Sequence, residues 1–297
     1  MLDRQFLEYL EGVKLYSPHT IQAYQNDLRQ FSAFVSSHFH FDPFRDAANL
    51  QKVNASICRA FFAYARGKKT TLQRKKSSLA RFFKYQIQLK NINHSPIPCL
   101  SFQGGDKKVP SVALEKEINL LLDQMQSLTT FEAVRDWCIF EVLYGCGLRR
   151  SELIAIQLED VDIKNRLLLV KGKGKKQRLQ PFNFTVAKAL QAYIEVCRRE
   201  GYDLSKAFFL TSKGEPLYPK FVYRTVKKYL TPLSYLERRS PHILRHTFAT
   251  HLLNRGADLL AVKELLGHAN IKSTERYLRS SIQRLREVYK NAHPRAE

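Results

Sequence analysis

The chain has 297 residues, 44% of them hydrophobic and 26% charged, which is enough for two domains with separate cores. No apolar run reaches the length of a membrane span, and the N-terminal residues 1–5 lack the apolar stretch of a secretory signal, so we expect a cytoplasmic protein. Lysine and arginine number 49 against 27 for aspartate and glutamate, a net charge of +22 that favours a polyanionic partner. A membrane surface or a ribosome would explain this charge as well as nucleic acid does.

The cysteines do not indicate a metal or disulfide framework. They are odd in number, scattered along the chain, and contain no C-x-x-C pair; they are Cys58, Cys99, Cys138, Cys146 and Cys197. A reducing compartment fits this pattern.

The N-terminal third reads as a helical bundle. Ser17 followed by Pro18 is a helix start, with a hydroxyl to cap free amides and a proline at the first helical position. Apolar residues then recur at helical spacing, namely Ile21, Tyr24, Leu28, Phe31 and Phe34. A weaker helix precedes this one, and another is expected over Ala55–Tyr64.

A basic segment closes this bundle. Residues 66–71 form a basic turn with a threonine cap, and the next helix carries Arg74, Lys75, Lys76, Arg81 and Lys84. Charge runs are usually just solvated, but the acidic residues here gather on the first helices instead. This asymmetry favours one face that lies on DNA phosphates.

Residues 91–110 contain Pro96, Pro98, Gly104, Gly105 and Pro110 with little helical periodicity. We therefore predict a linker at 91–110 between a helical DNA-binding domain at 1–90 and a second domain at 111–297. Two domains joined in this way could close around a duplex as a clamp.

The second domain is predicted to be mostly helical, with a small β-hairpin. Helices are expected at Glu115–Met125, Ala133–Tyr144, Phe184–Arg199 and Pro219–Leu230. Two short strands, Arg166–Val170 and Arg178–Phe182, flank a turn rich in glycine and lysine. The fold class is thus mainly α, with α+β character in the second domain.

Arg149 lies where one helix ends and the next begins. Gly145 and Gly147 break the helical pattern, and Leu148 to Leu153 start a new helix. An arginine at such a junction is held by the backbone close to amide donors, which suits an anion. Taken alone, a surface arginine at a helix end is the commoner explanation.

The segment from Ser240 onward holds further groups that suit phosphoryl transfer. Ser240 and Pro241 start a helix that presents His242 and Arg245 three residues apart, on one face. Leu244, Phe248 and Leu252 would hold the opposite side to the core. Asp258 can cap the following helix, which runs up to Gly267. His268 comes directly after that stop, and Tyr277 follows on what we expect to be one more short helix.

These motifs resemble those of the tyrosine recombinases, the phage-integrase family, and of the bacterial Xer subfamily in particular. Residues 147–153, Gly-Leu-Arg-Arg-Ser-Glu-Leu, resemble box I, and His242-x-x-Arg245-His246 with Gly267-His268 and Tyr277 resembles box II. The sequence Gly172-Lys173-Gly174 aligns with the lysine of the family's β-hairpin. The resemblance thus implies six catalytic residues: Arg149, Lys173, His242, Arg245, His268 and Tyr277.

The resemblance implies a mechanism without metal, ATP or any small-molecule cofactor. Tyr277 would attack a phosphodiester of duplex DNA and form a 3′-phosphotyrosine. The arginines and His268 would stabilise the phosphate. Lys173 would protonate the leaving oxygen, and His242 would take the tyrosine proton or stabilise the phosphorane. Glu152 would brace Arg149 or the nearby backbone. The resemblance also implies a homo- or hetero-tetramer on DNA, with a XerD-like recombinase as partner and exchanged C-terminal helices. It further implies resolution of chromosome dimers at cell division. The apolar stripe after Tyr277 could dock on a neighbour or on its own domain.

Other functions stay open at this point. The same residues would serve an integrase of a mobile element or a nicking-closing enzyme with the chemistry of type IB topoisomerases. A catalytically silent DNA-binding regulator would keep the fold alone.

Overall fold

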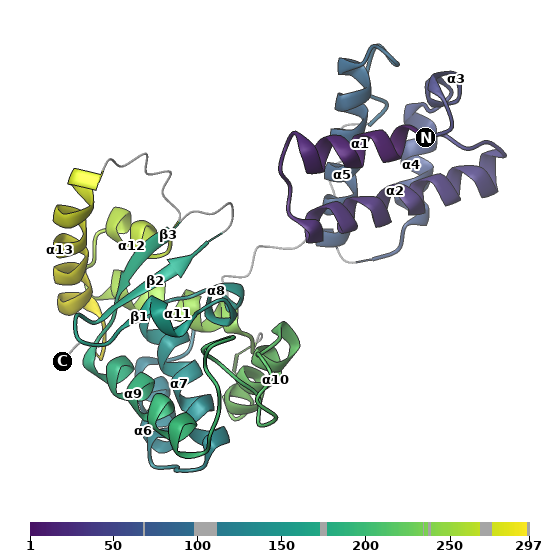
Figure 1. Cartoon of the computed structure of the whole chain (residues 1–297). Coiled ribbons are helices and arrows are strands. Elements are labelled where there is room, and N and C mark those ends of the chain that lie inside the picture. The colour runs from purple at the N-terminus through teal and green to yellow at the C-terminus, as the bar shows by residue number, and fades with distance from the viewer. Residues whose placement is uncertain are drawn as a thin grey trace. The chain divides into compact units, whose positions relative to one another are not determined.

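The computed structural model describes residues 1–67, 69–97, 112–172, 177–233, 235–236, 239–267 and 275–295, without the side chains of 275–281. The chain divides into two compact units, Met1–Lys107 and Lys108–Glu297 (Figure 1). Within the described ranges, no helix is both long and apolar enough to cross a membrane. The predicted fold class, mainly helical with a small sheet, is confirmed.

The first unit is a bundle of helices around an aromatic core. Its helices are α1 (Leu2–Gly12), α2 (Pro18–Phe39), α3 (Ala47–Gln51), α4 (Ala55–Tyr64) and α5 (Lys69–Gln88). Phe31 packs edge-on against Phe61 and Phe83, and Phe6 does the same against Phe82. Edge-to-face aromatic pairs add to the free energy gained from burial, so this core is well defined.

Two details of the first unit differ from the sequence prediction. The basic helix begins at Lys69, so Thr70 and Thr71 lie inside α5 instead of capping it. Helix α3 was not predicted, because its five residues are too few to show a helical period. Its start is fixed instead by Asp46, whose carboxylate accepts a hydrogen bond from the Asn49 amide at 2.8 Å.

The second unit surrounds one buried helix. Its elements are α6 (Glu115–Gln126), α7 (Phe131–Gly145), α8 (Arg150–Ile154), a 3₁₀ turn η1 (Leu158–Asp160), β1 (Val161–Asp162), β2 (Leu167–Lys171), β3 (Gln177–Pro181), α9 (Phe184–Arg199), α10 (Pro219–Leu230), α11 (Pro241–Asn254), α12 (Leu259–Leu265) and α13 (Glu275–Ala292). Helix α7 is apolar on nearly all sides and is buried along almost its whole length. A helix of this kind belongs at the centre of a unit.

The sheet is a three-stranded antiparallel meander in the order β1-β2-β3. Strands β2 and β3 form the predicted hairpin, shifted by one residue, and their register pairs Val170 with Arg178. Strand β1 was not predicted because it has only two residues. The register also pairs Lys171 with Gln177, so Arg178 lies one residue from the start of β3.

The helix caps are partly as expected. Asp258 accepts a hydrogen bond from the Ala261 amide at 3.0 Å, as predicted. Among the described residues, neither Ser17 nor Ser240 caps its helix through its hydroxyl, so that prediction was wrong. The Ser17 hydroxyl bonds to that of Thr20 instead. Proline after each serine still fixes the helix start, since its ring sets φ and it lacks an amide hydrogen.

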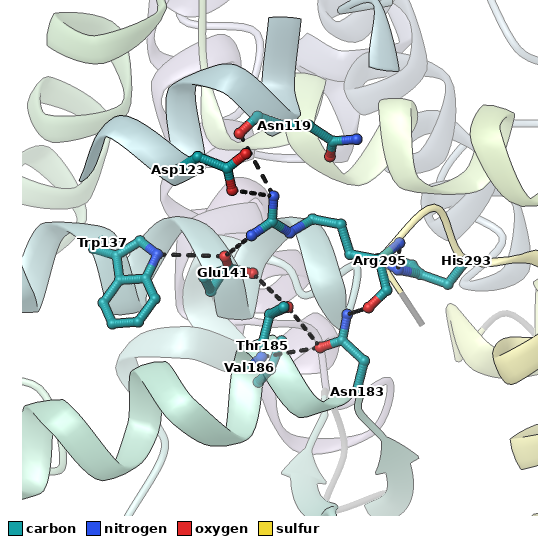
Figure 2. A network of polar contacts seen from close by, with 9 residues as sticks. All are labelled: Asn119, Asp123, Trp137, Glu141, Asn183, Thr185, Val186, His293 and Arg295. Atoms are coloured by element: carbon teal, nitrogen blue, oxygen red, sulfur yellow. Dashed lines mark hydrogen bonds and ion pairs between the residues drawn. The ribbon is translucent and has the colours of Figure 1, made fainter. Parts of the chain in front are cut away.

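The C-terminal residues dock on their own unit. Leu285 and Tyr289 of α13 are buried, and the Tyr289 hydroxyl donates to the Gly145 carbonyl at 2.8 Å. Figure 2 shows the Arg295 guanidinium between Asp123 and Glu141, with N–O distances of 2.8 and 3.2 Å. Glu141 is fully buried in α7, so Arg295 supplies the counter-charge that a buried carboxylate needs.

We predict that Gly147→Ala destabilises the second unit by about 3 kcal/mol. Gly147 has φ of +60°, and a Cβ there would lie 2.4 Å from a ring carbon of Phe248. The left-handed backbone costs an alanine about 1 kcal/mol and overpacking of the core adds about 1–3 kcal/mol. Denaturant unfolding followed by Trp137 fluorescence measures this, because the single tryptophan lies in α7.

Gly201→Ala is the matched control. Gly201 has φ of +76° but nothing within 4 Å of its added Cβ, so only the backbone cost of about 1 kcal/mol applies. Equal losses in the two variants would show that Phe248 does not hold the Gly147 turn.

Candidate active site

Arg149 stands at the sharp turn between α7 and α8. Gly147 takes a left-handed conformation there, and the ring of Phe248 from α11 packs directly under it. Arg149 is the residue before the first turn of α8, and its side chain is 36% exposed. The turn thus presents the guanidinium to solvent while its backbone is fixed by packing.

Glu152 is the centre of the site. Its carboxylate is 3% exposed and accepts hydrogen bonds from the Arg149 amide at 2.9 Å and from the Arg149 guanidinium at 2.6 Å. Arg178 of β3 donates to both carboxylate oxygens at 3.1 Å, in the bidentate geometry that arginine forms with carboxylates. Burial alone would raise the pKa of Glu152, but hydrogen bonds and charge from Arg178, and then from Arg149, lower the pKa to about 2.

Arg245 is the buried arginine of the site. It donates to the Gly147 carbonyl at 2.7 Å and to the Leu266 carbonyl at 2.5 Å, and its guanidinium lies 3.7 Å from Glu152. These contacts join α11, the Gly147 turn and the end of α12. Burial, and then the charge of Arg149, lowers the pKa of Arg245 to about 10, so it stays cationic at neutral pH.

His242 lies exposed on the first turn of α11. Its pKa is lowered, first by partial burial and then by the positive charges of Arg150, Arg245 and Arg149. The imidazole is therefore neutral at pH 7 and has a free electron pair for a proton. The structure brings His242, Arg149 and Arg245 into one electrostatic neighbourhood.

The other predicted residues lie outside the described part of the site. Lys173 and His268 fall in segments that the structure does not describe, and so does the side chain of Tyr277. Their neighbours are placed: Lys171 ends β2, and Gly267 follows α12. The helix that contains Tyr277 is α13, which has 18 residues and is not the short helix we expected.

Arg178 was missed as a site residue by sequence analysis, which assigned it only to a strand. Besides its two bonds to Glu152, its Nε donates to the Leu265 carbonyl at 3.2 Å. A Cβ on Gly267 would lie 3.1 Å from its guanidinium. Side chains alternate between the two faces of a strand, and Arg178 lies opposite the apolar Val170 in the hairpin. This alternation is the one signal that predicts an inward side chain at Arg178.

The described arrangement suits one bound anion. Three guanidinium groups face one carboxylate, so the cluster has excess positive charge, and only Arg149 among the three is well exposed. A phosphate oxygen near Arg149 would meet fixed donors in a partly buried site. Among the described residues there is no group of three or more His, Cys, Asp or Glu side chains placed to hold a metal ion.

We predict that Glu152→Gln lowers the unfolding free energy of the second unit by about 3 kcal/mol at pH 7. The folded pKa of about 2 lies below the ordinary value of 4.5, and each unit of pKa is worth about 1.4 kcal/mol. This stabilisation is complete above pH 4.5 and is lost as the pH falls toward 2. The two proteins should therefore converge in that range when unfolding is followed by Trp137 fluorescence.

Glu195→Gln is the control, since Glu195 is exposed on α9 of the same unit. Its effect should stay within about 0.5 kcal/mol at every pH. A gap between wild type and Glu152→Gln that is the same at pH 7 and pH 3.5 would contradict the role given to the Glu152 charge.

Known proteins resemble this chain along almost its whole length. Tyrosine recombinase XerC of Chlorobaculum parvum is 38% identical over 98% of this chain and 94% of the relative. XerC of Halalkalibacterium halodurans is 36% identical over 98% of this chain and 96% of the relative. Residues 4–90 match the N-terminal SAM-like domain of phage integrases.

Solved structures share the fold at lower identity. XerH recombinase in a post-cleavage complex with difH DNA has a TM-score of 0.68 at 22% identity, covering 95% of this chain and 84% of that one. The Tn1549 transposon integrase with transposon right end DNA has a TM-score of 0.69 at 21% identity, covering 96% and 99%. Residues 112–284 match the phage integrase family itself. The chain therefore belongs to the phage integrase family, the tyrosine recombinases, a class of site-specific DNA recombinase.

Proposed function

We propose that the chain cuts and rejoins duplex DNA through a 3′-phosphotyrosine formed on Tyr277. The observation that carries the proposal is the convergence of Arg149 and Arg245 on Glu152 beside a neutral His242. The Tyr277 oxygen attacks phosphorus and the bond to the 5′ oxygen breaks. The two guanidinium groups stabilise the charge on the non-bridging oxygens.

The proton transfers are assigned by residue type. His242 takes the phenol proton or stabilises the phosphorane, and His268 donates a hydrogen bond to the phosphate. Lys173 gives a proton to the leaving 5′ oxygen. A 5′ hydroxyl of a second strand then attacks the phosphotyrosine and releases Tyr277. Each step exchanges one phosphoester for another, so the proposed reaction uses neither metal nor nucleotide.

We propose that residues 1–90 form the core-binding domain, 91–110 a linker, and 111–297 the catalytic domain, and that the two domains clamp double-stranded DNA. Support comes from the basic helices of both units. Helix α5 carries Arg74, Lys76, Arg81 and Lys84, and α10 carries Lys220, Arg224, Lys227 and Lys228. Such residues bind phosphates without reading sequence.

The biological role that we propose is resolution of chromosome dimers in the cytoplasm during cell division. It rests on the XerC name of relatives that align over nearly the whole chain. The XerC likeness also supports action as a tetramer with a XerD-like recombinase on two duplexes. An integrase of a mobile element would use the same chemistry, so it is the alternative role.

Assembly is proposed to use the docking site of the C-terminal residues. In the single chain, Arg295 pairs with Asp123 and Glu141, and the Asn183 amide donates to the Arg295 carbonyl (Figure 2). In the tetramer, Asp123, Glu141 and Asn183 would contact Arg295 of a neighbouring subunit in the same way. Exchange of identical segments conserves these contacts, so it costs little free energy.

We predict that Tyr277→Phe binds its DNA site but forms no covalent adduct. The native site is found first by incubating the wild type with genomic DNA of its organism, denaturing, and sequencing the DNA that stays attached. A nicked duplex of that site then traps the adduct, and mass spectrometry identifies the linked residue. An adduct in Tyr277→Phe would show that another residue is the nucleophile.

Tyr223→Phe, at an exposed tyrosine of α10, is the matched control and should form the adduct like the wild type. The products separate the alternatives. An adduct with relaxation of supercoils but no strand exchange indicates a topoisomerase, and site-specific binding without any adduct indicates a silent regulator.

We predict that Arg295→Ala reduces paired DNA complexes about tenfold or more while binding to a single site persists. The change leaves the buried Glu141 without its counter-charge whenever the C-terminal segment docks, so the undocked segment becomes more populated. A subunit with an undocked segment can still bind one site, but it is no longer linked to its neighbour. Mass photometry on the cognate duplex measures both species. Arg199→Ala, which removes an exposed ion pair with Glu200, should leave the ratio unchanged; equal ratios in both variants would refute the exchange.

A further inference from the structure

Arg178 is held more firmly than any other group on Glu152. Its guanidinium makes two parallel hydrogen bonds to the carboxylate oxygens, both 3.1 Å long, and its Nε donates to the Leu265 carbonyl. Its side chain is 17% exposed. The backbone of β3 pairs with β2, and the Arg178 side chain contacts Glu152 and Leu265. All of these partners belong to the protein, so the contacts of Arg178 do not depend on DNA.

The Arg149 guanidinium contacts the same carboxylate but is less constrained than that of Arg178. Its guanidinium makes a single hydrogen bond to Glu152, at 2.6 Å, and its side chain is 36% exposed. The bond that fixes the turn is the separate one from the Arg149 amide. The guanidinium can therefore leave Glu152 while the backbone of the turn stays in place.

Arg245 does not need to move. Two backbone carbonyls, those of Gly147 and Leu266, hold its guanidinium, and Glu152 lies further away at 3.7 Å. A phosphate that arrives at the site would therefore compete with Glu152 for Arg149 above all. That competition is between two anions, and its outcome depends on what else neutralises Glu152.

We propose that Arg178 is a positioning residue, the permanent counter-charge of Glu152 that lets Arg149 exchange its ion pair with Glu152 for one with the scissile phosphate. The inference rests on the proposed function. With Arg178 in place, Glu152 keeps a bidentate partner when Arg149 departs, so no buried carboxylate is left unpaired. Without Arg178, Glu152 retains Arg149 and the phosphate loses it.

The test compares Arg178→Gln with the double variant Glu152→Gln/Arg178→Gln on the nicked cognate duplex. Arg178→Gln should slow adduct formation at saturating enzyme about 10- to 100-fold, the range typical of residues that orient a catalytic group. The double variant has the net charge of the wild type and no anion to retain Arg149, so it should regain at least about tenfold. DNA affinity should change little in either, because it is set by many phosphate contacts.

Two further variants separate charge from geometry. Arg178→Lys keeps the cation and loses the bidentate fork, so it should be faster than Arg178→Gln. Arg135→Gln removes another buried arginine of the same unit, one that pairs with Asp136 away from the site, and should reduce stability without slowing the folded enzyme. A double variant no faster than Arg178→Gln, or an Arg178→Lys no faster than it, would overturn the proposal.

The ion pair itself can be measured without DNA. Because Arg178 makes the largest contribution that lowers the pKa of Glu152, the pH at which Glu152→Gln ceases to affect unfolding should rise in an Arg178→Gln background. An unchanged pH would overturn the proposal. Wild type without any adduct would refute the proposed function and this inference with it; a wild-type adduct with full activity in Arg178→Gln refutes the inference alone.

Discussion

The site depends on one buried carboxylate. Glu152 is 3% exposed, and a charge so far from water is stable only beside cations. Arg149, Arg178 and Arg245 supply them from the turn before α8, from β3 and from α11, which are separate segments of the sequence. The carboxylate therefore draws the arginines together before any phosphate is present, and much of the free energy needed to arrange them is spent during folding. Preorganised charge of this kind is what makes a site effective in stabilising a developing negative charge.

The scaffold behind the carboxylate links the site to the C-terminal helix. Phe248 supports the Gly147 turn from below, and Tyr289 of α13 donates to the Gly145 carbonyl of the same turn. Helix α13 is also the helix that contains Tyr277. The arginine-bearing turn and the proposed nucleophile are thus held by a common set of contacts, so a C-terminal helix that leaves its place alters both.

Much of this organisation could be predicted from the sequence, and the failures have physical causes. Long amphipathic helices such as Phe184–Arg199 and Pro219–Leu230 were predicted to the residue, because their periodicity is strong. The five-residue helix α3 and the two-residue strand β1 show no clear period and were missed. The serine caps failed because proline alone sets the helix start. Arg178 escaped notice because its partner Glu152 is 26 residues away, and only the register of the sheet brings them together. The roles of Lys173, His268 and Tyr277 stay predictions.

The contacts of Arg295 have a consequence for proteolysis. This residue neutralises Glu141 at the centre of α7, although 154 residues separate the two in the sequence. A protease that removed the segment around Arg295 would leave a carboxylate without its counter-charge in the apolar surroundings of α7. A cut at the edge of the second unit would therefore weaken its central helix.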